Sequence, residues 1–169
     1  AKIIEEKKKR ELLAAKLIGL LCVACAVILL ALHGARYSGL GTNLITASFT
    51  GDTIYRYDWI LKLLLTIATL AIGFQGGEVT PLFSIGASLG VVLGSVFGIS
   101  PVNCASLGYA AVFGSATNTV IAPILIGLEV FGSQNAIPLV VVCLLAYMVN
   151  GNHSIYGAQV KALCSFEEK

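Results

Sequence analysis

The stretch Gly73-Phe-Gln-Gly-Gly-Glu-Val-Thr-Pro-Leu-Phe83 decides how the rest of the chain is interpreted. Its glycines can adopt backbone angles that are closed to other residues. Pro81 suits the first turn of a helix, because the N–H that proline lacks would have no hydrogen-bond acceptor in the helix there. Thr80 is the expected N-cap. The pattern predicts a helix start with unpaired N–H groups and a positive dipole end. Inside an apolar sequence, such a start is typical of an anion site.

The composition indicates a membrane protein. Of the 169 residues, 57% are hydrophobic and 12% are charged, whereas ordinary soluble domains carry roughly 25% charged residues. The mean hydropathy is +0.88. The first apolar run, 12–32, is about 20 residues long, or roughly 30 Å as a helix, which is enough to cross a bilayer.

Lysines and one arginine crowd the N-terminus, directly before that first apolar run. The positive-inside rule therefore places the N-terminus in the cytoplasm. We expect residues 1–169 to form a single multi-pass domain in the plasma membrane. Residues 1–11 are its cytoplasmic basic helix start, and residues 165–169 are a charged tail. A solvated helix start, with glutamates as partners, is compatible with the same placement.

Most of the later apolar segments are short or interrupted. We expect a short re-entrant helix within 44–49, a break at Ser100-Pro101 and a short amphipathic helix over 155–164. The main apolar segments are 60–72, 82–99, 103–115, 120–131 and 137–149. Broken helices at membrane depth are tolerated only where they line a cavity or are packed in protein, and transporters use them to direct helix ends at ions. The sequence predicts an all-α membrane protein with tilted, broken transmembrane helices and a transport function.

Glycine recurs at every fourth position of the segment 82–99. Small residues at this spacing let helix backbones approach closely in lipid. The residues are Gly86, Gly90, Gly94 and Gly98. We therefore expect this segment to pack directly against another helix.

Two carboxylates lie within the apolar region, where a charge is costly unless it is paired, protonated or facing water. Glu129 is expected to have a structural role, through a hydrogen bond to a neighbouring loop. Glu78 has two interpretations that stay open. It is a simple helix cap, or it couples protonation to anion occupancy, because a charged carboxylate repels an anion at the same helix start.

Several other functions are disfavoured by the sequence. Cys22 and Cys25 form a CxxC inside an apolar span, where small buried side chains are the expected role rather than a redox or metal site. His33 and His153 are far apart and lie in no metal or nucleophile pattern. A second basic patch with interleaved aromatics, as nucleic-acid binding would need, is absent. We expect no enzyme activity, no cofactor, no metal and no nucleic-acid partner.

Three motifs resemble the CLC family of chloride channels and transporters. Residues 76–82 (GGEVTPL), followed by 86–90 (GASLG), resemble that family's GGxFxP…G…G segment. Residues 120–129 (VIAPILIGLE) look like its RAPLTGxxLxxE helix. Residues 150–156 (NGNHSIY) fall where the family places its central pore tyrosine, which is Tyr156 here. The resemblance covers nearly the whole chain and implies one inverted-repeat half of a CLC-type subunit.

The GGEVTPLF form resembles the bacterial fluoride/proton antiporter branch of that family, with Val79 at the position of the usual phenylalanine. The resemblance implies that fluoride or another halide faces the backbone N–H groups of Glu78 and Val79 and the hydroxyls of Thr80 and Tyr156. It also implies a proton-coupling role for Glu78. Fluoride is strongly hydrated, so good hydrogen-bond donors must replace its water. An interfacial anchor is the alternative role for Tyr156, and a chloride-selective channel or exchanger half is the alternative function.

The chain matches only the second half of the family's pattern. The serine-containing anion loop and the gating glutamate of the first half have no counterpart in these residues. The resemblance therefore implies assembly with the missing N-terminal half or with a second copy, as a parallel or antiparallel homodimer in the lipid bilayer. A membrane-embedded half that folds and self-associates without transport is the alternative from another functional class.

Overall fold

The computed structural model describes residues 34–71, 76–151 and 153–156, together with residues 6, 9, 10, 12–14, 16–20 and 24. The first apolar run, the CxxC and His33 lie largely or wholly outside this part of the chain. So do the charged tail and nearly all of the amphipathic helix predicted over 155–164. Nothing in the structure bears on those predictions.

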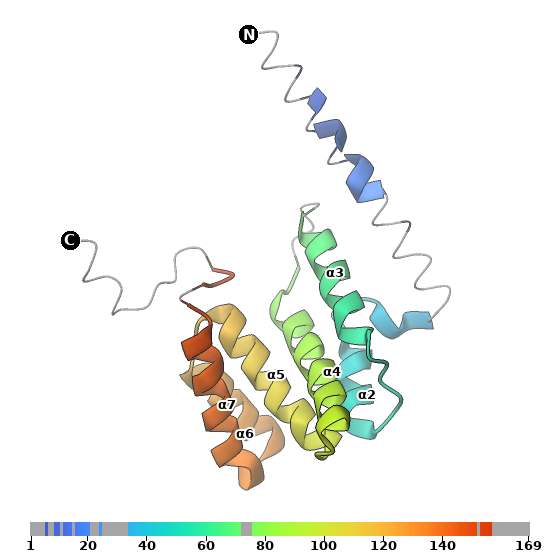
Figure 1. The fold of residues 1–169 in the computed structure, drawn as a ribbon. Coiled ribbons are helices and arrows are strands. Elements are labelled where there is room, and N and C mark those ends of the chain that lie inside the picture. Colours follow the sequence, from blue (N-terminus) through green and yellow to red (C-terminus); the bar gives the residue numbers. More distant parts are fainter. Residues whose placement is uncertain are drawn as a thin grey trace, which may run out of the picture.

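All regular secondary structure in the described residues is helical, which confirms the all-α prediction. The elements are η1 (Gly34–Tyr37), α2 (Thr42–Thr50), α3 (Asp58–Ala71), α4 (Val79–Phe97), α5 (Pro101–Thr117), α6 (Ile121–Phe131), η2 (Ser133–Asn135) and α7 (Ala136–Val149). Each predicted apolar segment contains one helix, and the short helix expected within 44–49 is α2. Figure 1 shows their arrangement.

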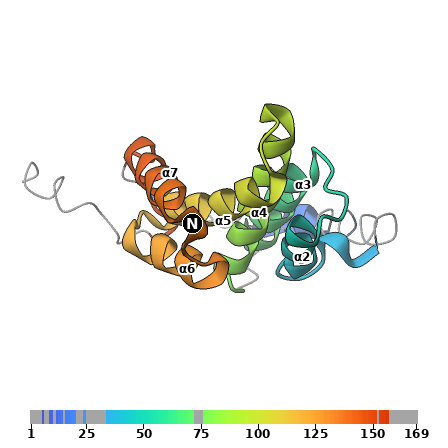
Figure 2. The same ribbon diagram turned by 90° about the horizontal axis from the view of Figure 1, so that it is seen from below.

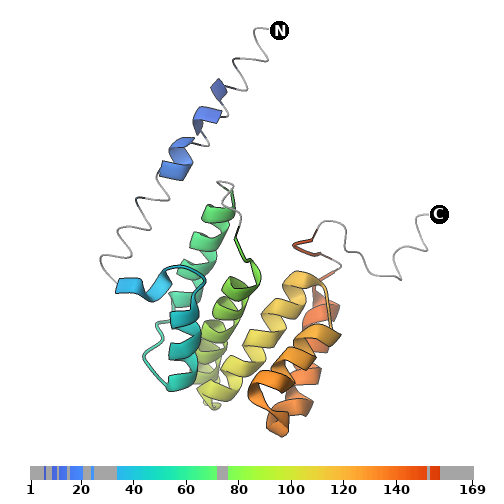
Figure 3. The ribbon, with the colours of Figure 1, turned by 180° about the vertical axis from the view of Figure 1, so that it is seen from behind.

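Helices α4 to α7 run alternately down and up, so that α4 and α6 begin, and α5 and α7 end, at the same end of the bundle (Figure 1). We call this the upper end, after its place in that view. Helix α5 packs against α4, α6 and α7, while α2 and α3 pack against α4. Seen from below, α6 and α7 lie on one side of the α4–α5 pair and α2 and α3 on the other (Figure 2). The view from behind shows the same order (Figure 3).

Helices α4 and α5 pack against each other at glycines, with almost no side chain between the two backbones. A Cβ atom added to Gly86 would collide with the carbonyl oxygen of Gly108, and one added to Gly90 would collide with that of Cys104. The predicted close packing of the four-residue glycine pattern is therefore confirmed, with α5 as the partner helix. Gly98 differs from the others, because it ends α4 in the left-handed conformation with a φ of 68°.

The structure corrects two predicted helix boundaries. Helix α4 begins at Val79 with Glu78 as N-cap, so Thr80 is not the N-cap and Pro81 is the third helical residue rather than the first. Pro81 is tolerated there because none of the first four N–H groups of a helix has an intrahelical acceptor. The predicted break at Ser100-Pro101 is confirmed, because it separates α4 from α5. Pro101 is itself the first residue of α5, where its fixed φ suits the helix, so α5 begins two residues before the predicted segment 103–115.

The interior is small and the outer surfaces are strongly apolar. Ala110, Leu139 and Cys143 form a buried cluster where α5 and α7 meet. Stacked and tilted rings join α2, α4, α5 and α6, and these rings belong to Phe49, Phe83, Tyr109 and Phe131. Many large apolar side chains on the outer faces are exposed. Among the described helices, α4 alone has the length and hydropathy of a bilayer span, and this is weak evidence by itself.

Candidate anion-binding site

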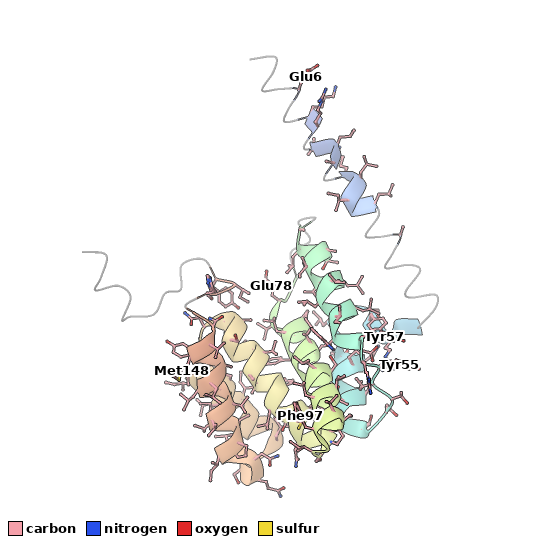
Figure 4. The ribbon with its side chains drawn as sticks, in the orientation of Figure 1. Glu6, Tyr55, Tyr57, Glu78, Phe97 and Met148 are labelled. Carbon is pink, nitrogen blue, oxygen red and sulfur yellow. The ribbon has the colours of Figure 1, made fainter. Side chains whose placement is uncertain are left out.

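The first turn of α4 presents unpaired amides at the upper end of the bundle. The leading N–H groups of an α-helix have no intrahelical acceptor and carry the positive end of the helix dipole. Glu78 occupies the N-cap position, but its carboxylate accepts no capping hydrogen bond from these amides. Figure 4 shows Glu78 at the beginning of α4, with Phe97 at the opposite end of the same helix. Glu78 is therefore the N-cap of α4 by position, as the simple-cap interpretation expects, but its side chain makes no capping hydrogen bond.

Glu78, Val79 and Thr80 are all half-buried, so each can be reached from outside the bundle. Within the described part of the chain, neither the Glu78 carboxylate nor the Thr80 hydroxyl takes part in a hydrogen bond or ion pair. The adjoining Gly77 packs loosely against Leu40, whose Cδ2 would lie 3.9 Å from an added Cβ. This turn therefore offers three backbone amides, one hydroxyl and one carboxylate within three consecutive residues.

Tyr156 lies at the same upper end, in the segment that follows α7. Its segment is held by the N–H of Ile155, which donates to the carbonyl oxygen of Ala116 at 2.9 Å. Ala116 lies in the last turn of α5. The Tyr156 side chain is 47% exposed, and within the described residues no hydrogen bond links it to Glu78, Val79 or Thr80. The structure thus brings three of the four predicted site residues together, and the fourth only to the same end of the bundle.

The sequence analysis did not identify a buried charged cluster beside α4. Asp58, in the first turn of α3, is fully buried. Its carboxylate accepts hydrogen bonds from Arg36 Nη2 at 2.7 Å, from the Tyr37 hydroxyl at 2.5 Å and from the Tyr55 N–H at 2.9 Å. Burial, followed by the hydrogen bond to Asp58, raises the pKa of Tyr37 above its ordinary value. We call Arg36, Tyr37, Asp58 and Lys62 the charged cluster.

Lys62 lies one helical turn after Asp58 and is only 3% exposed. Its ammonium donates to the carbonyl oxygens of Tyr37, at 3.1 Å, and Gly39, at 2.7 Å. Gly41, with a φ of 84°, lets this turn approach α4 closely, because an added Cβ would lie 2.5 Å from Ser84 Oγ and 2.7 Å from Lys62 Cε. The sequence signal that could have revealed the cluster is the pair Asp58 and Lys62, which are opposite charges at i, i+4 spacing at the start of an apolar helix.

The remaining candidate residues lie away from the upper end or do not form a site. Glu129 is exposed near the lower end of α6, and it forms no hydrogen bond with the described residues, so the predicted bond to a neighbouring loop is not found in this part of the chain. Cys104 and Cys143 are free thiols. The described residues contain no group of three potential metal ligands.

Comparison with known proteins places these features in a family. Residues 2–151 match the family model described as voltage gated chloride channel. The chain is 57% identical to a solved CLC-type fluoride/proton antiporter, with a TM-score of 0.78 over 85% of this chain and 36% of that one. It is 40% identical, over 73% of its length, to a chloride/fluoride channel protein of Pseudomonas syringae pv. tomato, of which it covers 27%.

A third relative is an uncharacterized protein of Methanocaldococcus jannaschii, 30% identical over 56% of this chain and 24% of that one. The chain therefore spans about a third or less of the length of each of these proteins. Its match to the family model ends at residue 151, five residues before Tyr156. Because that match nonetheless extends over 150 of the 169 residues, the chain belongs to the voltage-gated chloride channel (CLC) family, whose members form channels and transporters in membranes.

Proposed function

We propose that this chain carries out fluoride/proton antiport as the second half of a CLC-type transporter. The observation that carries the proposal is the start of α4, where unpaired amides adjoin a glutamate that does not cap them. The 57% identity with a CLC-type fluoride/proton antiporter and the 40% identity with a chloride/fluoride channel protein support it. The transported ions are then fluoride, or another halide, and protons.

In this proposal the anion replaces its water with protein donors. The N–H groups of Glu78 and Val79 and the hydroxyls of Thr80 and Tyr156 donate to it, and the dipole of α4 favours its negative charge. A charged Glu78 beside the anion is unfavourable, so anion binding favours the protonated carboxyl. Release of the anion allows the same carboxyl to lose its proton. Occupancy by fluoride and protonation of Glu78 are thereby linked at one helix start.

The chain needs further protein to complete this site, because no hydrogen bond within the described residues links Tyr156 to the turn at Glu78. We propose that residues 1–169 form one multi-pass domain of the plasma membrane, with residues 1–11 in the cytoplasm. The missing N-terminal half, or a second copy in a homodimer, covers the exposed apolar faces within the lipid bilayer. In this proposal the chain moves ions and catalyses no chemical reaction.

A second candidate is a half-transporter that folds and self-associates without moving ions. The many exposed apolar side chains on its outer faces favour it, because they are available for self-association. In that case the chain alone forms a stable membrane species, and transport requires the remaining part. The two candidates differ in whether the pure chain moves fluoride.

A liposome experiment distinguishes them. The chain is reconstituted alone and together with the N-terminal half of the solved antiporter, and fluoride efflux and proton uptake are recorded in parallel. We expect coupled movement of both ions, lost in Glu78→Gln. Glu129→Gln is the matched control, because that carboxylate is exposed near the other end of the bundle.

Each outcome has a defined meaning. Flux only when the other half is present identifies the chain as an inactive half on its own. Fluoride movement that Glu78→Gln leaves coupled to protons would refute the role of Glu78. Chloride movement without fluoride movement would show that the transported anion is chloride rather than fluoride. Crosslinking in detergent that yields only monomer would exclude the homodimer.

A further inference from the structure

Tyr156 lies in a segment without helix or strand, seven residues beyond the end of α7. Few contacts hold it. The Ile155 N–H donates to the carbonyl oxygen of Ala116 at 2.9 Å, and the Tyr156 N–H donates to Ser154 Oγ at 3.1 Å. Because the side chain is about half exposed, packing contributes little to its placement. Its position therefore depends on how the turn before it is attached to the helices.

Besides the Ile155 N–H bond to Ala116 and a backbone bond from the His153 N–H to the carbonyl oxygen of Asn150 at 3.4 Å, one side-chain amide contributes to that attachment. Asn150 follows the last residue of α7, and its Nδ2 donates to the carbonyl oxygen of His153, in the turn that leads to Tyr156. The same nitrogen lies 3.4 Å from Oδ1 of Asn118, and Oδ1 of Asn150 accepts from Ser115 Oγ at 3.4 Å. The two longer bonds are the weaker ones. Together they tie the end of α7, the end of α5 and the turn at His153 to a single residue.

The partners of Asn150 on α5 are themselves fixed with respect to the anion-binding turn. Asn118 ends α5 in the left-handed conformation, with a φ of 53°, and is 6% exposed. Helix α5 in turn contacts α4 backbone to backbone at Gly86 and Gly90. A continuous series of contacts thus runs from α4, through α5 and Asn150, to the turn that carries Tyr156.

We propose that Asn150 is a positioning residue for Tyr156. Its amide holds residues 153–156 on the end of α5, and this sets where the Tyr156 hydroxyl lies relative to the first turn of α4. Asn150 does not touch the anion. The inference rests on the proposed function, because it takes Tyr156 as an anion ligand, but the attachment of the turn can be tested without any ion.

Amide hydrogen exchange in lipid nanodiscs tests the attachment directly. In Asn150→Ala, the amides of residues 153–156 should exchange about tenfold faster, because the change removes the side-chain hydrogen bond to the carbonyl oxygen of His153 and the two longer bonds to Ser115 and Asn118. Asn135→Ala is the matched control. It removes a 3.2 Å amide bond to Asn103 at the other end of α7 and should leave residues 153–156 unchanged. Unchanged exchange of α4 and α5 in both variants shows that the bundle is folded.

A double-mutant cycle tests whether the positioning matters for transport. With the N-terminal half present, Asn150→Ala should raise the fluoride KM about fivefold and change the maximal rate less than twofold. The same substitution in a Tyr156→Phe background should raise the KM no further, because the hydroxyl that it positions is gone. Asn135→Ala should leave the KM unchanged in both backgrounds.

The outcomes separate the two proposals. If Asn150→Ala raises the KM equally in the parent and in the Tyr156→Phe background, Asn150 acts elsewhere. Equal exchange in Asn150→Ala and the parent would overturn the attachment. If the parent assembly moves no fluoride, the proposed function fails. The exchange experiment then decides alone whether Asn150 positions the turn.

Discussion

Two acidic residues lie at the starts of neighbouring apolar helices but differ in burial and in hydrogen-bond partners. Asp58, in the first turn of α3, is fully buried and accepts hydrogen bonds from an arginine, a tyrosine and a backbone N–H. Glu78, at the N-cap of α4, is half-buried and has no capping hydrogen bond. A buried carboxylate with several hydrogen-bond partners is part of the structure, whereas one without partners among the described residues can be changed at little structural cost. Position at a helix start therefore does not by itself distinguish a structural carboxylate from a functional one.

The largest expected effect on stability is that of Asp58→Asn. This change leaves the Arg36 guanidinium next to a neutral amide in a largely buried setting, and breaking a buried ion pair costs about 3 kcal/mol or more. We expect loss of the folded, monodisperse protein in detergent, measured by size exclusion and thermal unfolding. An unfolding midpoint equal to that of the parent would show that the charged cluster is not structural.

Lys62→Met should have the next largest effect. It removes the ammonium that donates to the carbonyl oxygens of Tyr37 and Gly39, so one buried and one partly buried acceptor lose their partner, at a cost of about 2 kcal/mol. Methionine keeps the length of the side chain, so packing is largely preserved. Thermal unfolding in the same detergent measures the difference, and Lys16→Met, at an exposed position, is the control.

Tyr37→Phe isolates one hydrogen bond of the charged cluster. Removal of the hydroxyl that donates to Asp58 should cost about 1.5 kcal/mol. Because the pKa of Tyr37 is raised in the folded state, its stabilising contribution is complete below the ordinary tyrosine pKa of about 10 and is lost as the pH rises above it. The parent should therefore lose stability above about pH 10 more steeply than Tyr37→Phe. Parallel pH profiles of unfolding would contradict this assignment.

Glu78→Gln should have the smallest effect on stability, within about 0.5 kcal/mol, because no described partner loses a contact. Its effect should appear instead in proton coupling. A destabilisation as large as that of Asp58→Asn would show that Asp58 and Glu78 contribute equally to the stability of the fold. It would also indicate a structural role for Glu78 that the described contacts do not contain.

The local pattern of the sequence predicted the helices better than it predicted the contacts between distant segments. The helix predicted over 120–131 is observed as Ile121–Phe131, because turn and polar residues flank it on both sides. The start of α4 was misplaced by two residues, since proline is acceptable anywhere in the first turn. The charged cluster joins residues 36 and 37 to 55 and 58 across a glycine-rich connection, and its pairing depends on tertiary packing that no local spacing encodes.

The candidate site shows the same division. The resemblance assigned all four site residues. Glu78, Val79 and Thr80 are consecutive, so the structure places them in one turn at the start of α4. Tyr156 is held at the end of α5, where the Ile155 N–H donates to the carbonyl oxygen of Ala116. The proposed role of Asn150 was missed because its three side-chain partners lie at the end of α5 and in the turn at His153, which no local pattern connects to the end of α7.

The glycine contacts between α4 and α5 also limit how an ion pathway can open. Helices that slide past one another need an intervening layer of adjustable side chains, and here main chain lies directly on main chain at Gly86 and Gly90. We therefore expect α4 and α5 to move together. In the proposed transport function, access of ions to the start of α4 then depends on movement of its surroundings, such as the turn at Tyr156 or the protein that covers the outer faces.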